Sequence, residues 1–174
     1  MTPWVVLFRG VGGATQLPVA PLRAALIAAG FARVATYINS GNAVLASPLP
    51  REEVVEAVSR AVLPFGFRKD VHAASLPEWE EVVAATPFPD HGGKALHAAW
   101  LGRSPDPARV EALRALAAPG EALEVRGRVA YLLTPESFGT SRMAAAFDRG
   151  IGVPSTARNW NTVARLLLMA REAA

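Results

Sequence analysis

A polar segment near the C-terminus carries the residue types best suited to binding a charged ligand. Residues 158–162 comprise an arginine, two asparagines, a tryptophan and a threonine, and apolar residues then recur across 163–170 at the i, i+3, i+4 and i+7 spacing of one helical face. Asn159 or Asn161 suits the N-cap of this helix, whose first turn carries about half a positive elementary charge. With Arg158 beside it, the helix start is a candidate site for a carboxylate or phosphate.

The same segment also has a purely structural interpretation. In that interpretation an asparagine caps the helix, Trp160 fills part of the core, and Arg158 pairs with an internal carboxylate. The sequence leaves both interpretations open.

A glycine-rich loop near the N-terminus is the second candidate. Residues 4–8 form the continuous apolar run of a buried strand, and residues 9–14 follow as Arg-Gly-Val-Gly-Gly-Ala. The backbone N–H groups of such a loop, placed before a helix, can cradle an anion. The loop lacks the Gly-Lys-Ser/Thr of a Walker loop, and its spacing differs from the dinucleotide fingerprint. The alternative is a tight turn with glycines at positive φ and Arg9 in an internal ion pair.

Two further segments carry polar side chains at the ends of expected elements. Residues 37–42 read Tyr-Ile-Asn-Ser-Gly-Asn and supply a phenol, amides and a hydroxyl near a hairpin tip, with ordinary turn chemistry as the alternative. Residues 90–97 hold the densest group of titratable side chains, including His91 and His97. The spacing of these two histidines across a Gly-Gly pair matches no standard metal motif, so we expect a mobile polar loop, no metal and no cofactor.

Composition limits the class of protein. The chain has 174 residues, of which 51% are apolar and 19% charged, and it has no cysteine, which fits a reducing cytosol. It lacks an apolar run of about 18 residues and a basic patch ahead of its first apolar run, so we expect a cytoplasmic protein without a membrane span or secretory signal. The net charge of +3, with basic residues scattered among acidic ones, permits contact with nucleic acid without favouring it.

The first half of the chain shows the pattern of a ferredoxin-like unit. Its apolar periodicities and turn residues predict the order β-α-β-β-α-β in an antiparallel sheet. The expected elements are a strand at 4–8, a helix at 18–30, strands at 32–38 and 43–46, a helix at 51–63 and a strand at 67–73.

Both faces of the first strand are apolar. Trp4, Val6 and Phe8 point one way, and Val5 and Leu7 point the other. The helices of this arrangement cover only one face, so the second half of the chain or a dimer mate must cover the other. Monomer and homodimer both stay open.

The second half begins with the capping box Ser75-Leu76-Pro77-Glu78. We predict an α+β protein with a ferredoxin-like subdomain at 1–74 and a smaller α+β subdomain at 75–174 packed against it, together one compact domain. No internal repeat is evident. The expected elements are a helix after residue 75, a loop at 86–94, a strand at 96–101, a helix at 107–117, a hairpin of 122–125 with 129–133, a helix at 141–149 and the closing helix.

Several motifs occur in order along nearly the whole chain, and in them it resembles the family catalogued as domain of unknown function 1697. The first loop is shorter than the family's usual Arg-Gly-Ile-Asn-Val-Gly-Gly form, and Asn39 stands where Gln is common. The resemblance implies a two-part α+β fold with a ferredoxin-like first part, and no established activity, cofactor or catalytic residue. The motifs include Leu-Phe-Arg-Gly at 7–10, Val-Gly-Gly at 11–13, Thr-Tyr-Ile-Asn-Ser-Gly-Asn at 36–42, Thr-Pro-Phe-Pro at 86–89 and Arg-Asn-Trp-Asn-Thr-Val at 158–163.

Three functions fit these features. The favoured one is a binding module whose polar segments converge at the seam of the subdomains on a small anionic ligand or a nucleic-acid phosphate. The nucleic-acid option is weak, because the strand at 43–46 lacks aromatics that stack on bases. The alternatives are an enzyme for a phosphorylated or nucleotide-like substrate, with Arg9 and Arg158 stabilising charge, and a structural or interaction protein without a ligand. The candidate ligand-binding residues are Arg9, Gly10, Gly12, Gly13, Tyr37, Asn39, Ser40, Asn42, Arg158, Asn159, Trp160, Asn161 and Thr162.

Overall fold

The computed structural model describes residues 1–174, and the chain forms two compact units. Unit 1 comprises residues 1–81 and 165–174, and unit 2 comprises residues 82–164. The boundaries fall within helix α3 (Leu76–Ala84) and helix α6 (Trp160–Glu172), so each of these helices contributes residues to both units. None of the helices is long and apolar enough to cross a membrane.

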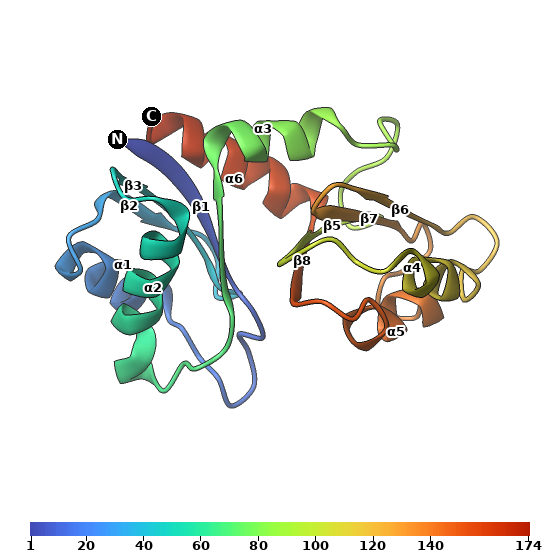
Figure 1. The fold of residues 1–174 in the computed structure, drawn as a ribbon, viewed down its shortest axis with the longest axis horizontal. Coiled ribbons are helices and arrows are strands. Elements are labelled where there is room, and N and C mark those ends of the chain that lie inside the picture. The colour runs from blue at the N-terminus through green and yellow to red at the C-terminus, as the bar shows by residue number, and fades with distance from the viewer. The chain divides into compact units, whose positions relative to one another are not determined.

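Unit 1 is built on a four-stranded antiparallel sheet (Figure 1). The strand order β2-β3-β1-β4 and the chain order β-α-β-β-α-β confirm the ferredoxin-like arrangement expected from the sequence. The elements are β1 (Thr2–Phe8), α1 (Val19–Ala28), β2 (Ala32–Thr36), β3 (Asn42–Ser47), α2 (Arg51–Val62), a 3₁₀ turn at Leu63–Phe65 and β4 (Val71–Ser75).

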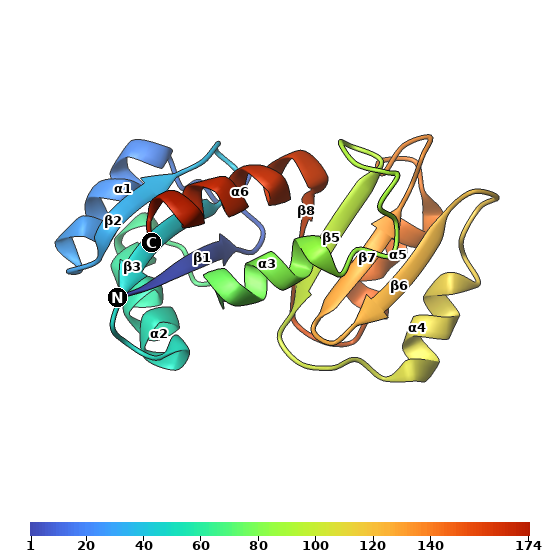
Figure 2. The same cartoon turned by 90° about the horizontal axis from the view of Figure 1, so that it is seen from above.

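The two faces of this sheet pack against different helices. Trp4, Val6 and Phe8 join the apolar residues of α1 and α2 in one core cluster, as the alternation along β1 predicts. Val5 and Leu7 on the opposite face are 0% and 2% exposed. Figures 1 and 2 show the C-terminal part of α6 along that face, so the second half of the chain does cover it within unit 1.

Polar contacts fix the last helix in unit 1. The Arg33 guanidinium of β2 donates to the carbonyl oxygen of Ala173 at 3.1 Å, and Arg171 pairs with Glu80 of α3 at 2.9 Å. Both guanidinium groups thereby join α6 to elements of the first part of the chain.

Unit 2 has the same topology as unit 1, although no sequence repeat is evident. Its antiparallel sheet has the order β6-β7-β5-β8, and α4 and α5 lie together on one face of it (Figure 1). The elements are β5 (Leu96–Leu101), α4 (Pro107–Arg114), β6 (Ala122–Arg126), β7 (Val129–Leu133), α5 (Arg142–Gly150) and β8 (Ser155–Asn159).

Two segments depart most clearly from the sequence prediction. Residues 155–159, expected to lie at the start of the closing helix, form strand β8 and pair with β5, and the helix begins at Trp160. The strand predicted at 67–73 runs instead from Val71 to Ser75, because it pairs with β1 only from Phe8↔Val71 to Trp4↔Ser75. In both cases a partner strand distant in sequence sets the boundary.

Candidate functional site

In unit 1 the glycine-rich loop lies beside the turn at 37–42. The N–H of Phe8 donates to the carbonyl oxygen of Gly41 at 2.9 Å. Gly41 has a φ of 77°, and a Cβ added there would lie 2.7 Å from a Val11 methyl group and 2.9 Å from Cβ of Phe8. Glycine is therefore required at Gly41 both by the backbone conformation and by the close approach of the loop.

The polar groups of the glycine-rich loop have partners inside unit 1. Arg9 pairs with Asp70 at 3.3 Å, and Lys69 Nζ donates to the carbonyl oxygen of Gly10 at 2.9 Å. The N–H of Gly12 donates to the Thr15 carbonyl at 2.7 Å, and the Thr15 N–H donates back to the Gly12 carbonyl at 3.0 Å. These contacts match the tight-turn interpretation of the loop, because the Gly12 N–H is hydrogen-bonded within the loop and does not point to a ligand.

The turn at 37–42 has a comparable internal network. Asn42 is fully buried, and its Nδ2 donates to the Tyr37 carbonyl at 3.1 Å and to Ser40 Oγ at 2.9 Å. The neighbouring Ile38 is 49% exposed and has a φ of +46°. A β-branched residue rarely adopts that conformation, so the turn stores backbone strain at an exposed position.

In unit 2 the segment 158–162 caps a helix and carries a partly buried arginine. Arg158 Nη1 donates to Thr156 Oγ1 at 2.7 Å and to the Ala157 carbonyl at 2.8 Å. Burial lowers the pKa of Arg158 from 12.5 to about 10, so the guanidinium stays charged at neutral pH. Asn159 Oδ1 accepts the N–H of Thr162 at 3.0 Å, so of the two asparagines that the sequence left open Asn159 is the N-cap.

The predicted residues thus fall into two groups, each within its own unit. The glycine-rich loop and the 37–42 turn are neighbours in unit 1, and residues 158–162 lie in unit 2. Convergence of the two groups on one ligand stays a prediction.

Unit 2 contains a pocket of about 310 Å³ at one edge of its sheet. Lys94, Ala95 and His97 line it where β5 begins, residues 134–139 where β7 has ended, and Asn159 where β8 ends. Because β5 runs antiparallel to both β7 and β8, its start and their ends meet at the same edge. The volume lies at the lower end of the range typical of small-molecule sites, roughly 300–1,000 Å³.

Two buried polar atoms in this pocket have no hydrogen-bond partner in the protein. They are Oγ1 of Thr134, a residue only 1% exposed, and Nδ1 of His97. The His97 ring stacks on Phe138 with centroids 3.8 Å apart and 22° between the planes. Burial lowers the pKa of His97 from 6.5 to about 4, so the imidazole is neutral at pH 7.

The sequence drew attention to His97 and Asn159 but missed Thr134 and Phe138. The pattern that could have identified Thr134 is the alternation of side chains along a strand. Ala130, Leu132 and Thr134 are spaced by two residues, and the first two belong to the core of unit 2, so Thr134 is expected on the same face. Thr134 comes directly after the last residue of β7, so its burial could be predicted only if the end of this strand were known.

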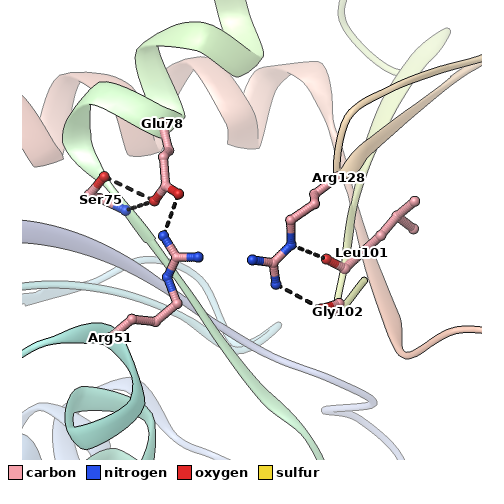
Figure 3. Close-up of polar contacts among 6 residues, drawn as sticks. All are labelled: Arg51, Ser75, Glu78, Leu101, Gly102 and Arg128. Atoms are coloured by element: carbon pink, nitrogen blue, oxygen red, sulfur yellow. Dashed lines mark hydrogen bonds and ion pairs between the residues drawn. The ribbon is translucent and has the colours of Figure 1, made fainter. Parts of the chain in front are cut away.

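The corresponding edge of unit 1 is filled by side chains. Trp4 pairs with Leu45 and Ser75, just as His97 pairs with Leu132 and Asn159, so Trp4 and His97 are equivalent. Arg51 lies 5.9 Å above the Trp4 ring and pairs with Glu78, which also accepts hydrogen bonds from Ser75 (Figure 3).

The helix starts explain why unit 2 is open at this edge. In unit 1 only residues 48–50 separate β3 from α2, whose first residue is Arg51. In unit 2 residues 134–141 separate β7 from α5, and the first part of this segment lines the pocket. A later helix start and an imidazole in place of an indole therefore leave space in unit 2.

A second arginine in Figure 3 has a structural role within unit 2. Arg128 Nε donates to the Leu101 carbonyl at 3.2 Å and Nη2 to the Gly102 carbonyl at 2.8 Å, and its guanidinium lies 5.6 Å from the Trp100 ring centroid. These contacts tie the end of β5 to the β6–β7 hairpin.

Comparison with known proteins agrees with the fold. A family model described as "Protein of unknown function (DUF1697)" matches residues 1–131, three quarters of the chain. The chain belongs to this family. The DUF1697 assignment confirms the resemblance found in the sequence motifs.

A solved structure shares the fold of this chain. The conserved bacterial protein SP0830 from Streptococcus pneumoniae is 22% identical to this chain, with a TM-score of 0.76, and the match covers 97% of this chain and 98% of that protein. At this identity the likeness shows the fold alone. A search of curated proteins found no match.

Proposed function

We propose that this protein is a binding module whose unit 2 pocket takes a small molecule bearing a carboxylate or phosphate. The observation that carries the proposal is the pair of buried polar atoms, Thr134 Oγ1 and His97 Nδ1, that line the pocket without a protein partner. A buried polar group left unsatisfied costs roughly 1–3 kcal/mol. A bound ligand, or water in its absence, offsets that cost.

The charged and amide groups around the pocket favour an anion. Lys94 supplies an ammonium group. Asn159 Oδ1 is occupied by the N–H of Thr162, so the amide group of Asn159 that remains for a ligand is its NH₂ donor. The Thr134 hydroxyl and the Nδ1–H tautomer of neutral His97 add two further donors. Glu136 is the opposing charge, and it is exposed.

This proposal keeps the small anionic ligand expected from the sequence and narrows its location to Asn159 and its neighbours in unit 2. Arg9 and Asn42, the other predicted contacts, already bond to groups of unit 1. We therefore build the proposal on the pocket alone.

The test is titration of the full-length protein with acetate and with inorganic phosphate, followed by amide NMR. We expect saturable shifts concentrated at residues 94–97, 134–139 and 159. Thr134→Val keeps the side-chain shape and removes the hydroxyl, so it should weaken binding about tenfold, equivalent to about 1.4 kcal/mol. Glu136→Gln should strengthen binding about twofold, because it removes a repulsive charge.

Thr36→Val provides the matched control, since Thr36 lies in β2 of unit 1 and donates to the Val19 carbonyl. It should leave anion binding unchanged. Shifts that do not saturate, or equal affinities for wild type and Thr134→Val, would contradict the proposal.

A further inference from the structure

We infer that the ligand of the unit 2 pocket is an aromatic carboxylate. The inference rests on the proposed binding function and adds the chemical class of the ligand. Its basis is the internal duplication of the fold: unit 1 shows which groups fill the same edge of the same sheet when the chain supplies them itself.

The strand registers define which residues are equivalent. Trp4 pairs with Leu45 and Ser75, and His97 pairs with Leu132 and Asn159. Counting on by two residues along β3 and along β7 makes Ser47 the counterpart of Thr134. Counting on by three residues from Ser75 and from Asn159 makes Glu78 the counterpart of Thr162.

Unit 1 fills this edge with an aromatic ring and with the ion pair of Arg51 and Glu78. The indole of Trp4 is 6% exposed and belongs to the core cluster of the unit. The Glu78 carboxylate accepts hydrogen bonds from the backbone N–H of Ser75 at 2.8 Å and from its hydroxyl at 2.9 Å, and it pairs with Arg51 (Figure 3).

Unit 2 lacks both groups at the equivalent positions. The single imidazole ring of His97 replaces the double ring of Trp4, and the short hydroxyl side chain of Thr162 replaces the carboxylate of Glu78. The pocket of about 310 Å³ lies at this edge, with Phe138 stacked on His97. The ring of an aromatic carboxylate occupies space of the kind that the larger indole of Trp4 fills in unit 1, and its carboxylate is the anionic group of the proposed function.

The polar and apolar lining of the pocket suits the two ends of such a ligand. The carboxylate accepts hydrogen bonds from Thr134 and His97 and faces the ammonium of Lys94. The ring packs on the apolar side chains Pro135 and Phe138.

The experiment compares benzoate with three probes that each lack one of its features, by isothermal titration or NMR on the full-length protein. Benzoate should bind at least tenfold more tightly than acetate, which lacks the ring. It should also bind at least tenfold more tightly than benzamide, which lacks the charge, and several-fold more tightly than cyclohexanecarboxylate, whose ring is not aromatic.

The outcomes test the aromatic class of the ligand separately from the anion-binding function. Equal affinities for acetate and benzoate would overturn the aromatic class and leave the anion-binding function standing. Equal affinities for benzamide and benzoate would overturn the carboxylate. If none of the anionic probes binds, both the anion-binding function and the aromatic class are wrong.

Two variants connect the result to the pocket. His97→Trp installs the side chain that unit 1 carries at the equivalent position, so it should fill the pocket and reduce benzoate affinity more than tenfold. Phe138→Leu stays apolar but has no ring, so it should remove most of the preference for benzoate over cyclohexanecarboxylate even if His97→Trp fails to fold.

Phe147→Leu is the matched control, because Phe147 lies in the core of unit 2 and does not line the pocket. It should leave the preference unchanged. If Phe147→Leu and Phe138→Leu alter the preference equally, the aromatic inference is wrong.

Discussion

At the scale of the residue, the pocket combines open volume with two buried polar atoms that have no hydrogen-bond partner in the protein. Desolvation keeps His97 neutral, and stacking on Phe138 fixes its ring without using Nδ1. Thr134 is more buried still and has no protein partner for its hydroxyl. Most buried polar groups in proteins are satisfied, so two unsatisfied ones lining one pocket support the ligand site that we propose there.

The depressed pKa of His97 makes a contribution to stability that depends on pH. The unfolded state takes up a proton at His97 below pH 6.5, and the folded state does so only near pH 4. Stability should therefore fall as the pH is lowered from 6.5 to 4, since the unfolded state binds more protons in that window. Relative to His97→Gln, which cannot titrate, the wild type should lose about 1 kcal/mol or more between pH 7 and pH 4.5.

Chemical denaturation at several pH values measures this difference. His91→Gln is the matched control, because it makes the same substitution at an exposed position. A wild-type curve parallel to that of His97→Gln across the window would contradict a neutral buried imidazole.

Backbone strain at Ile38 leads to a second prediction at this scale. Asparagine tolerates positive φ far better than a β-branched residue, so Ile38→Asn should raise the free energy of unfolding by about 1 kcal/mol. That corresponds to a rise in Tm of about 2–4 °C for a chain of this size. Ile27→Asn is the control, because Ile27 is similarly exposed but lies in helix α1, where asparagine should destabilise.

At the scale of the element, the start of α3 shows how a short-range motif and a tertiary contact combine. Burial by itself would raise the pKa of Glu78, but hydrogen bonds from Ser75 and Arg51, with the charge of Arg51, lower it below 4.5. Glu78 accepts the Ser75 N–H, which is one of the two hydrogen bonds of a capping box, and it also accepts a hydrogen bond from the Ser75 hydroxyl. Arg51 then connects α3 to the start of α2.

Glu78→Gln should destabilise the protein by about 1 kcal/mol at neutral pH. Because the folded-state pKa is depressed, the contribution is present above pH 4.5 and is lost as the pH falls through the folded-state value. Denaturation of both proteins between pH 7 and pH 3 measures the difference, which should shrink at the acid end. Glu81→Gln in the same helix is exposed and should have little effect at any pH. A pH-independent difference for Glu78→Gln would contradict the assignment.

At the scale of the whole molecule, the chain repeats one topology and then returns to its first unit. Residues 165–174 belong to unit 1, where they cover the apolar face that carries Val5 and Leu7. The two units differ at one edge of the sheet. Unit 1 fills this edge with Trp4, and unit 2 has a pocket at the equivalent edge.

Shortening a buried side chain of α6 should therefore destabilise unit 1. Leu166 is fully buried, so Leu166→Ala should cost about 3 kcal/mol and lower Tm by roughly 10 °C. Leu168→Ala lies in the same helix with its side chain 51% exposed and should cost less than about 0.5 kcal/mol. Thermal unfolding of both variants is the measurement, and similar Tm values for the two would show that α6 does not contribute to the core as described.

The sequence by itself determined the ferredoxin-like order of the first half and the two faces of β1, and it limited the cap of the last helix to Asn159 or Asn161. These features depend on periodicity and on residues a few positions apart, so local patterns carry them. Tertiary structure alone decided that residues 155–159 form a strand and that unit 2 repeats unit 1, because strand pairing is set by segments distant in sequence. It also decided the pocket, since His97 lies in β5 and Thr134 directly follows β7, and the two meet only through the register of these strands.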